Sequence, residues 1–363
     1  MPKFLTGVNQ GWFSNAYGGD LGRNQFSGAE LWHWPHTDPV TFDFTRPDPS
    51  PPAPLASQQP ALVDQYFQLV QGVDVSRIWL FERLEGIRFD DDKKIVGIDA
   101  ELLANLHRVL DSAQSHGVKV YLCLLDAWAV KHQPSQGLPA ARLPHYDDWN
   151  RTIREIMKSI VESPSDFISN VLAPLVSSIA GHPAVYAIDV MNEPEGMISD
   201  THVVSTASMR NYVSSCCQAI RPHFKASVGC MKSSTAKSYS DLPVDFSDFH
   251  SYGKTASLFS YGSSGYGGKP CIVGECGYPV TNANSAARAA GEVQAAQGYV
   301  QEALEKGYSA CLAWNRDFTS EANNASLVQW LVQFAAGNRQ VAPERPPSPF
   351  AALIAWLAGL LGR

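Results

Sequence analysis

Short apolar runs alternate along the chain with segments in which apolar residues recur every three or four positions. The apolar runs predict β-strands, and they lie at residues 4–9, 75–81, 118–125, 185–191, 225–230, 244–249, 271–277 and 308–314. The segments with helical spacing predict helices at residues 58–71, 99–116, 149–179, 206–220, 286–305 and 325–336, with a break near Pro164 in the third of them. Eight strands that alternate with helices predict an α/β fold with a parallel sheet. For a chain of 363 residues we expect a single (β/α)8 barrel, or TIM barrel.

Two stretches do not follow this alternation. The loop between the first strand and the first helix is long and rich in aromatic residues, glycine and proline, and we expect it to form a wall of the functional site. The second stretch divides the chain into a barrel over residues 1–341 and a tail over residues 342–363. The tail reads as a proline-rich linker followed by an apolar helix at residues 350–361.

The apolar helix of the tail is shorter than the roughly 20 residues that a bilayer span requires. It is therefore expected to dock on the barrel, on a second subunit or on a membrane surface. Residues 1–3 lead directly into the first expected strand, so no signal peptide is expected in the chain as written. This predicts a cytoplasmic protein, or a secreted one whose leader has been removed.

Composition restricts the function classes. Hydrophobic residues make up 45% of the chain and charged residues 17%, which allows a large core. The formal net charge of −7 argues against nucleic acid as the main partner. The seven cysteines have no framework spacing and are expected to be small buried hydrophobes rather than disulfide partners. No phosphate-binding glycine loop and no zinc motif is present in the sequence.

Two glutamates stand at the ends of expected strands. The run before Glu193 stops at Asn192-Glu193-Pro194, and a second short run ends at Glu275. They are about 80 residues apart, which leaves room for about two intervening strands at roughly 40 residues per βα unit. The carboxyl ends of barrel strands carry the reactive groups of such folds. Two carboxylates at one cleft are what the cleavage of a glycosidic bond requires, one as the proton donor and one as the nucleophile or base.

The chain resembles the retaining (β/α)8 glycoside hydrolases with an Asn-Glu-Pro signature, and most of all glycoside hydrolase family 5, the cellulase and β-mannanase family. The resemblance covers residues 4–336 and rests on motifs in the family's order, each on or at the end of an expected strand. These motifs are Arg77, Asn192-Glu193-Pro194, His250-x-Tyr252, Glu275 and Trp314.

The resemblance implies a role for each motif residue. Glu193 would be the acid/base and Glu275 the nucleophile. Asn192 would hydrogen-bond the sugar 2-hydroxyl, and Arg77 would keep Glu275 ionised. The remaining motif residues would contact sugar or neighbouring carboxylates: Tyr252 as a donor to Glu275, His250 as a hydrogen-bonding group, and Trp314 as an apolar platform.

Four further residues are candidates for substrate binding. Asp126 and Trp128 follow the third strand, where the mannanase branch of the family often has an Asn-Asn-Trp segment, and Asp126 replaces an amide there. Trp12 and Trp34 belong to the aromatic first loop, of which one or two residues are expected to stack on sugar. Trp79 lies mid-strand and is expected to be a core residue.

The remaining acidic residues do not predict a metal site. Asp20, Asp43 and the run 90–92 stand in expected loops, and such acids are usually solvated. We therefore expect neither a metal requirement nor a cofactor.

The sequence thus predicts a retaining β-glycoside hydrolase that cleaves β-linked hexopyranose oligo- or polysaccharides, of the β-mannan or β-glucan type, by double displacement. Endo and exo cleavage both stay open. The alternatives are a transglycosylase with the same residues and a non-catalytic carbohydrate-binding barrel. The presence of both glutamates argues against the non-catalytic barrel.

Overall fold

In the computed structural model, the described residues are 3–13, 18–25, 53–131, 143–253, 255–261, 265–277, 286–314 and 322–341. The expected tail helix and Trp34 lie outside these ranges, and so does most of the first loop. Within the described ranges, none of the helices is both long enough and apolar enough to cross a bilayer.

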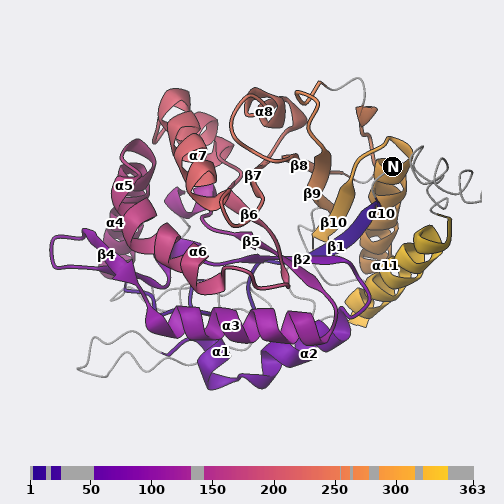
Figure 1. Cartoon of the computed structure of the whole chain (residues 1–363), viewed down its shortest axis with the longest axis horizontal. Helices are drawn as coiled ribbons and strands as arrows, with labels where there is room; N and C mark the ends of the chain where they lie inside the picture. The colour runs from indigo at the N-terminus through magenta and orange to yellow at the C-terminus, as the bar shows by residue number, and fades with distance from the viewer. Residues whose placement is uncertain are drawn as a thin grey trace, which may run out of the picture.

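Eight parallel strands close into a barrel, which confirms the predicted fold class (Figure 1). Around the ring they follow the order β1, β2, β5, β6, β7, β8, β9 and β10, after which β10 pairs with β1 again. Their bounds are β1 Leu5–Gln10, β2 Val75–Trp79, β5 Lys119–Cys123, β6 Val185–Asn192, β7 Ala226–Cys230, β8 Ser247–Tyr252, β9 Cys271–Gly277 and β10 Ala310–Trp314. A hairpin of β3 (Ile87–Phe89) and β4 (Ile95–Ile98), which the sequence pattern did not predict, follows β2.

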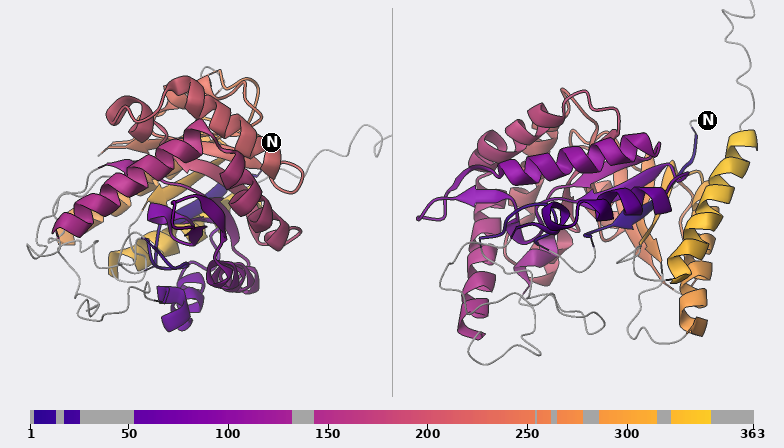
Figure 2. Two further views of the ribbon diagram at one scale, coloured as in Figure 1. Left: turned by 90° about the vertical axis from the view of Figure 1, so that its left-hand side faces the viewer. Right: turned by 90° about the horizontal axis from the view of Figure 1, so that it is seen from below.

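Helices surround the strands (Figures 1 and 2). Their bounds are α1 Leu55–Gln58, α2 Ala61–Leu69, α3 Ala100–Ser115, α4 Leu143–Glu162, α5 Ser165–Phe167, α6 Ala173–Ile179, α7 Thr206–Ile220, α8 Ser233–Ser238, α10 Ala286–Glu305 and α11 Ala322–Val341. The expected bounds of α7 and α10 are confirmed, whereas the single helix expected at 58–71 is two short helices. The expected helix at 149–179 begins earlier, at residue 143. Its expected break near Pro164 is confirmed, because α4 ends at Glu162 and α5 begins at Ser165.

Local chemistry explains where α3 begins and ends. The side chain of Asp99 accepts a hydrogen bond from the backbone N–H of Glu101 and so caps the first turn. Gly117 follows the last turn with φ +72°, a conformation that glycine adopts without steric cost. Between these ends, Leu102, Leu106 and Val109 are fully buried and share one face of the helix. The helix therefore packs by that face against the barrel.

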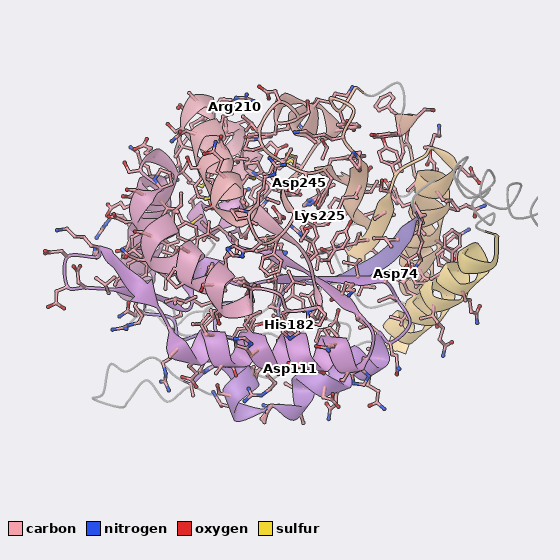
Figure 3. All side chains as sticks on the ribbon, in the orientation of Figure 1. Asp74, Asp111, His182, Arg210, Lys225 and Asp245 are labelled. Carbon is pink, nitrogen blue, oxygen red and sulfur yellow. The ribbon has the colours of Figure 1, made fainter. Side chains whose placement is uncertain are left out.

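The core has two layers. Inside the barrel, a small cluster that includes Val75, Tyr121 and Phe246 fills the interior. A larger cluster fills the space between the strands and the helices. All seven cysteines are buried, as expected, and none forms a disulfide. On the outer surface, a ring nitrogen of His182 lies 3.2 Å from a carboxylate oxygen of Asp111 of α3 (Figure 3).

Irregular pairing occurs at the strands that carry the expected site. The register shifts by one residue between β8 and β9 next to His250, and again between β9 and β10. Gly274 lies in this bulged part of β9, where a Cβ atom would stand 2.1 Å from Oδ1 of Asp248. Because a bulge re-aims the side chains that follow it, the irregularity helps to set the direction of Glu275. β8 itself spans Ser247–Tyr252 instead of the expected 244–249, so His250 and Tyr252 lie within it.

Candidate active site

Glu193 and Glu275 face one another at the carboxyl end of the barrel. Glu193 directly follows β6 and adopts φ +46°, and its backbone N–H donates to the carbonyl of Gly229 at 2.6 Å. A left-handed conformation is strained for a residue other than glycine, and strain of this kind clusters at functional sites. Glu275 lies within β9. An oxygen of Glu193, an oxygen of Glu275 and a ring nitrogen of His250 all lie within 4.8 Å of one another.

Arg77 hydrogen-bonds Glu275, the nucleophile candidate, and three other buried side chains. Its Nη1 donates to Oε1 of Glu275 at 2.6 Å and to Oδ1 of Asn9 at 3.1 Å. Its Nη2 donates to Oδ2 of Asp189 at 2.7 Å and to Oδ1 of Asn192 at 2.9 Å. Both Arg77 and Asp189 are fully buried. The rigid guanidinium fork therefore fixes four side chains from three further strands in one arrangement.

His250 lies between the two glutamates. Its Nδ1 is 2.7 Å from Oε1 of Glu193 and 3.3 Å from Oε2 of Glu275. Burial alone would lower the pKa of His250, but the charge of Glu275 and the bond to Glu193 raise it to about 9. The ring is therefore protonated near neutral pH. Tyr252 donates its hydroxyl to Oε2 of Glu275.

Glu193 is held by donors from two directions. The indole N–H of Trp128 donates to Oε2, and His250 binds Oε1. Burial by itself would raise the pKa of Glu193, but these hydrogen bonds and the charge of His250 hold the pKa below its usual value. In the resting site the proton of this pair therefore resides on His250.

Asp126 hydrogen-bonds Asn192, and Trp128 hydrogen-bonds Glu193. Asp126 is buried, and its Oδ1 accepts from Nδ2 of Asn192 at 3.0 Å and from the backbone N–H of Trp128 at 3.1 Å. Through these bonds the side chain of Asp126 orients Asn192 and the start of the segment that carries Trp128.

Three tryptophans form an aromatic group at the mouth. The ring centroids of Trp12 lie 5.8 Å from Trp79 and 6.2 Å from Trp314, and those of Trp79 and Trp314 lie 5.6 Å apart. Trp314 is the most exposed of the three. Trp79 is buried as expected, but it belongs to this group and not to the barrel interior, since it ends β2.

Sequence reasoning missed Asn9 and Asp189. Asp189 is a charged residue in the middle of an apolar strand, which was the signal that could have found it. Asn9 lies near the end of β1, the same position in a strand that made the glutamates candidates. Gly229 also contributes, because a Cβ atom there would lie 2.8 Å from Oδ2 of Asp189 and 3.1 Å from Nη2 of Arg77.

One expectation about the loop acids was wrong. Asp20 is fully buried, next to Glu82 and Glu85, and is not solvated. It lies on a loop that folds back onto the barrel, where backbone amides take the place of water. Asp90, Asp91 and Asp92 are exposed, as expected, and Asp43 lies outside the described residues.

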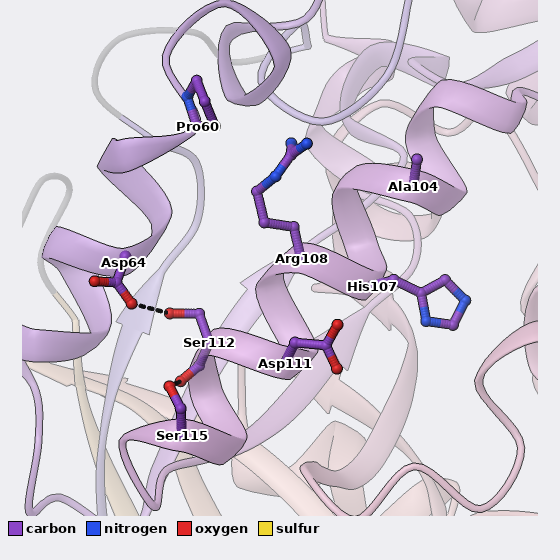
Figure 4. Close-up of a pocket in the computed structure, with 8 residues that line it drawn as sticks. All are labelled: Pro60, Asp64, Ala104, His107, Arg108, Asp111, Ser112 and Ser115. Atoms are coloured by element: carbon purple, nitrogen blue, oxygen red, sulfur yellow. Dashed lines mark hydrogen bonds between the residues drawn. The ribbon is translucent and has the colours of Figure 1, made fainter.

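A hollow of about 540 Å³ lies on the outside of the barrel between α2 and α3 (Figure 4). Its polar groups already have partners within the protein. Arg108 donates to the carbonyl of Ala56 at 3.1 Å, and Asp64 accepts from Ser112 at 3.0 Å. The hollow therefore offers no set of unsatisfied groups that would compete with the barrel mouth as a functional site.

No family model matches the chain. The mannan endo-1,4-beta-mannosidase of Mytilus edulis is 26% identical over 196 residues, and that of Cryptopygus antarcticus is 25% identical over 199 residues. Each match covers 54% of this chain but spans only 41% and 39% of those relatives' lengths. Two solved structures have the same fold. The β-mannanase of Mytilus edulis has a TM-score of 0.60 at 18% identity and covers 91% of this chain and 92% of its own. The β-1,4-mannanase of Aplysia kurodai has a TM-score of 0.60 at 18% identity, with 92% of both chains covered.

Proposed function

We propose that this chain, a β-mannanase-like barrel of the glycoside hydrolase family 5 type, hydrolyses β-1,4-linked mannan with retention of configuration. One observation carries the proposal, namely the pair of carboxylates with oxygens within 4.8 Å of each other. Retaining glycosidases need carboxyl groups about 5–5.5 Å apart, whereas inverting enzymes leave about 6.5–9.5 Å for a water molecule. The choice of mannan as substrate follows from the two curated relatives, which are both mannan endo-1,4-beta-mannosidases.

In the first step, a carboxylate oxygen of Glu275 attacks the anomeric carbon. The bond from that carbon to the glycosidic oxygen breaks, and the leaving oxygen takes a proton from Glu193. Glu193 receives that proton from His250, whose Nδ1 lies 2.7 Å from Oε1 of Glu193. The product is a glycosyl ester on Glu275. Proton donation and covalent catalysis thus use two carboxyl groups in different environments.

In the second step, water attacks the anomeric carbon and Glu193 receives the proton of that water. The ester bond to Glu275 breaks, and the carboxylate returns to its hydrogen bonds with Arg77 and Tyr252. Both donors stabilise the leaving carboxylate, and Arg77 does so without moving, because it is fully buried and fixed by Asp189.

Asn192 and Trp314 are the residues that we propose contact the sugar directly. Nδ2 of Asn192 has two hydrogens and donates one to Asp126, so the second is proposed to bind the sugar 2-hydroxyl. Such a bond strengthens in the transition state. Trp314 is proposed to offer its face to the apolar side of the pyranose, supported from behind by Trp12 and Trp79.

Trapping of the covalent intermediate tests this proposal. The protein is incubated separately with the 2-deoxy-2-fluoro fluorides of mannose, glucose and galactose, and intact mass and peptide mapping follow. We expect one stable adduct, from the manno compound, on Glu275. Glu275→Gln is the matched control and should show none. An adduct on another residue refutes the assignment of the nucleophile, and an adduct from the gluco compound alone refutes the substrate.

A further inference from the structure

Three buried carboxylates from two loops meet outside the catalytic pair. Asp20 belongs to the loop after β1, and Glu82 and Glu85 belong to the loop after β2. One carboxylate oxygen of each lies within 4.8 Å of an oxygen of the other two. None of the three residues is more than 1% exposed. We call these three residues the carboxylate cluster.

Backbone amides satisfy only part of the cluster. Oδ2 of Asp20 accepts from Phe13 at 2.9 Å, Oε2 of Glu82 accepts from Gly18 at 3.0 Å, and Oε2 of Glu85 accepts from Asp20 at 3.0 Å. Among the described residues, Oδ1 of Asp20 and Oε1 of Glu82 are buried and accept no hydrogen bond from an N–H or O–H donor group. Across the described ranges, no lysine or arginine forms an ion pair with any member of the cluster.

Buried carboxylates without a countercharge are costly, so something must neutralise the cluster. A proton is one means. Asp20 and Glu85 are close enough to share a proton. That arrangement still leaves the second oxygen of Glu82 without a donor, although Glu82 is only 1% exposed.

We propose that Asp20, Glu82 and Glu85 together bind one hard divalent cation, with Ca²⁺ the expected ion. Carboxylate oxygens are the ligands that such cations prefer. Bonds from Ca²⁺ to oxygen are about 2.3–2.6 Å long, so ligands on opposite sides of the ion stand about 4.6–5.2 Å apart. Oxygens within 4.8 Å of one another therefore fit in its coordination shell. Ca²⁺ also accepts irregular geometry, whereas Mg²⁺ retains water molecules in a strict octahedron.

A cation at this point would tie the two loops together. The loop after β1 carries Trp12, which belongs to the aromatic group at the mouth. The loop after β2 leads directly into the β3–β4 hairpin. The cation would thus contribute to stability and would hold one wall of the mouth in place, without contacting the reacting atoms.

Calcium-dependent unfolding of the whole protein tests the site. Metal content is measured by mass spectrometry before and after treatment with a chelator. The thermal midpoint is then measured against CaCl₂ concentration at pH 8, where protons compete least for carboxylates. We expect a saturable rise of several degrees, because a ligand that binds only the folded state stabilises it. Titration calorimetry with CaCl₂ should give one site per chain.

Variants decide where the cation binds. Glu82→Gln keeps the shape of the side chain but weakens the ligand set, and Asp20→Asn provides a second test if Glu82→Gln does not fold. Both should lose the response to calcium. The matched control replaces the exposed Asp91 and Asp92 with asparagine and should keep the response in full.

Two results would overturn the proposal. The first is a wild-type protein that contains no metal as purified and shows no midpoint shift with Ca²⁺, Mg²⁺ or Mn²⁺, because protons then neutralise the cluster. The second is a full calcium response in both Glu82→Gln and Asp20→Asn, because the ion then binds elsewhere on the chain.

Discussion

Asparagine in place of Asp189 would remove one charge from a fully buried ion pair without changing side-chain size. Oδ2 of Asp189 accepts from Nη2 of Arg77 at 2.7 Å, and Oδ1 accepts from the backbone N–H groups of Gly229 at 2.9 Å and Met191 at 3.1 Å. If the oxygen of asparagine keeps the two backbone donors, its NH₂ group must face the guanidinium of Arg77. Two donors then point at each other in a site that water does not enter.

The expected loss of stability follows from this geometry. Removal of one partner from a buried ion pair costs about 3–5 kcal/mol. Arg77 keeps its bond to Glu275 at 2.6 Å and its bond to Asn192 at 2.9 Å. The lower end, ~3 kcal/mol, is therefore expected for Asp189→Asn. Urea unfolding followed by circular dichroism measures it, and with a slope of about 3 kcal/mol per molar urea the midpoint should fall by about 1 M.

Catalysis should change in the same variant. Asp189 shares the positive charge of Arg77 with Glu275, so without Asp189 the guanidinium acts more strongly on the nucleophile and makes it less reactive. A drop in kcat/KM of ~10- to 100-fold on mannan oligosaccharides is expected, or ~1.4–2.8 kcal/mol of barrier. The matched control is Asp241→Asn, which removes an exposed partner of Arg210 and should leave both measurements unchanged. A wild-type urea midpoint for Asp189→Asn would refute the reasoning.

Three further changes test other parts of the site. Trp128→Phe removes the indole donor to Glu193 and should lower kcat on mannan ~10-fold, while an aryl mannoside with a good leaving group is spared in parallel assays. Gly274→Ala places a Cβ 2.1 Å from Oδ1 of Asp248 and should cost ~3 kcal/mol or more in urea unfolding; an unchanged midpoint would contradict the bulge geometry. The pKa of His250 is raised from 6.5 to about 9 on folding, so its contribution of ~3 kcal/mol is complete below pH 6.5 and is lost as pH rises through 9. Free energies of unfolding measured at pH 6, 7.5 and 9.5 should show that decline. In His250→Asn the free energy of unfolding should depend less on pH over the same range.

The barrel could be predicted because each strand is a local apolar run. The periodicity also gave the bounds of α7 and α10, since their buried faces repeat at helical spacing. The β3–β4 hairpin was not predictable in the same way. Its strands contain only three and four residues, which is too short for an alternation of apolar and polar positions to be recognised, and no residue of β4 is fully buried.

The two glutamates could be found because each ends or interrupts an apolar run. Their partners could not all be found from the sequence. Asn9 and Asp189, which the sequence analysis missed, reach Arg77 only when the ring closes and β1 pairs with both β2 and β10. The bulge near Gly274 could not be predicted from the sequence either, because it depends on the register of β9 with both neighbouring strands. These features depend on contacts between distant segments, and a periodic pattern contains no information about them.

Two of the groups of buried carboxylates among the described residues have opposite electrostatic surroundings. Glu193 and Glu275 contact Arg77 and a protonated His250, so protein cations balance their charge and the proton can move within the site. Asp20, Glu82 and Glu85 receive only backbone amides from the described residues. The same carboxyl chemistry therefore supports different roles. A group with internal cations can change protonation during a reaction, whereas a group without them requires an external cation to remain both ionised and buried.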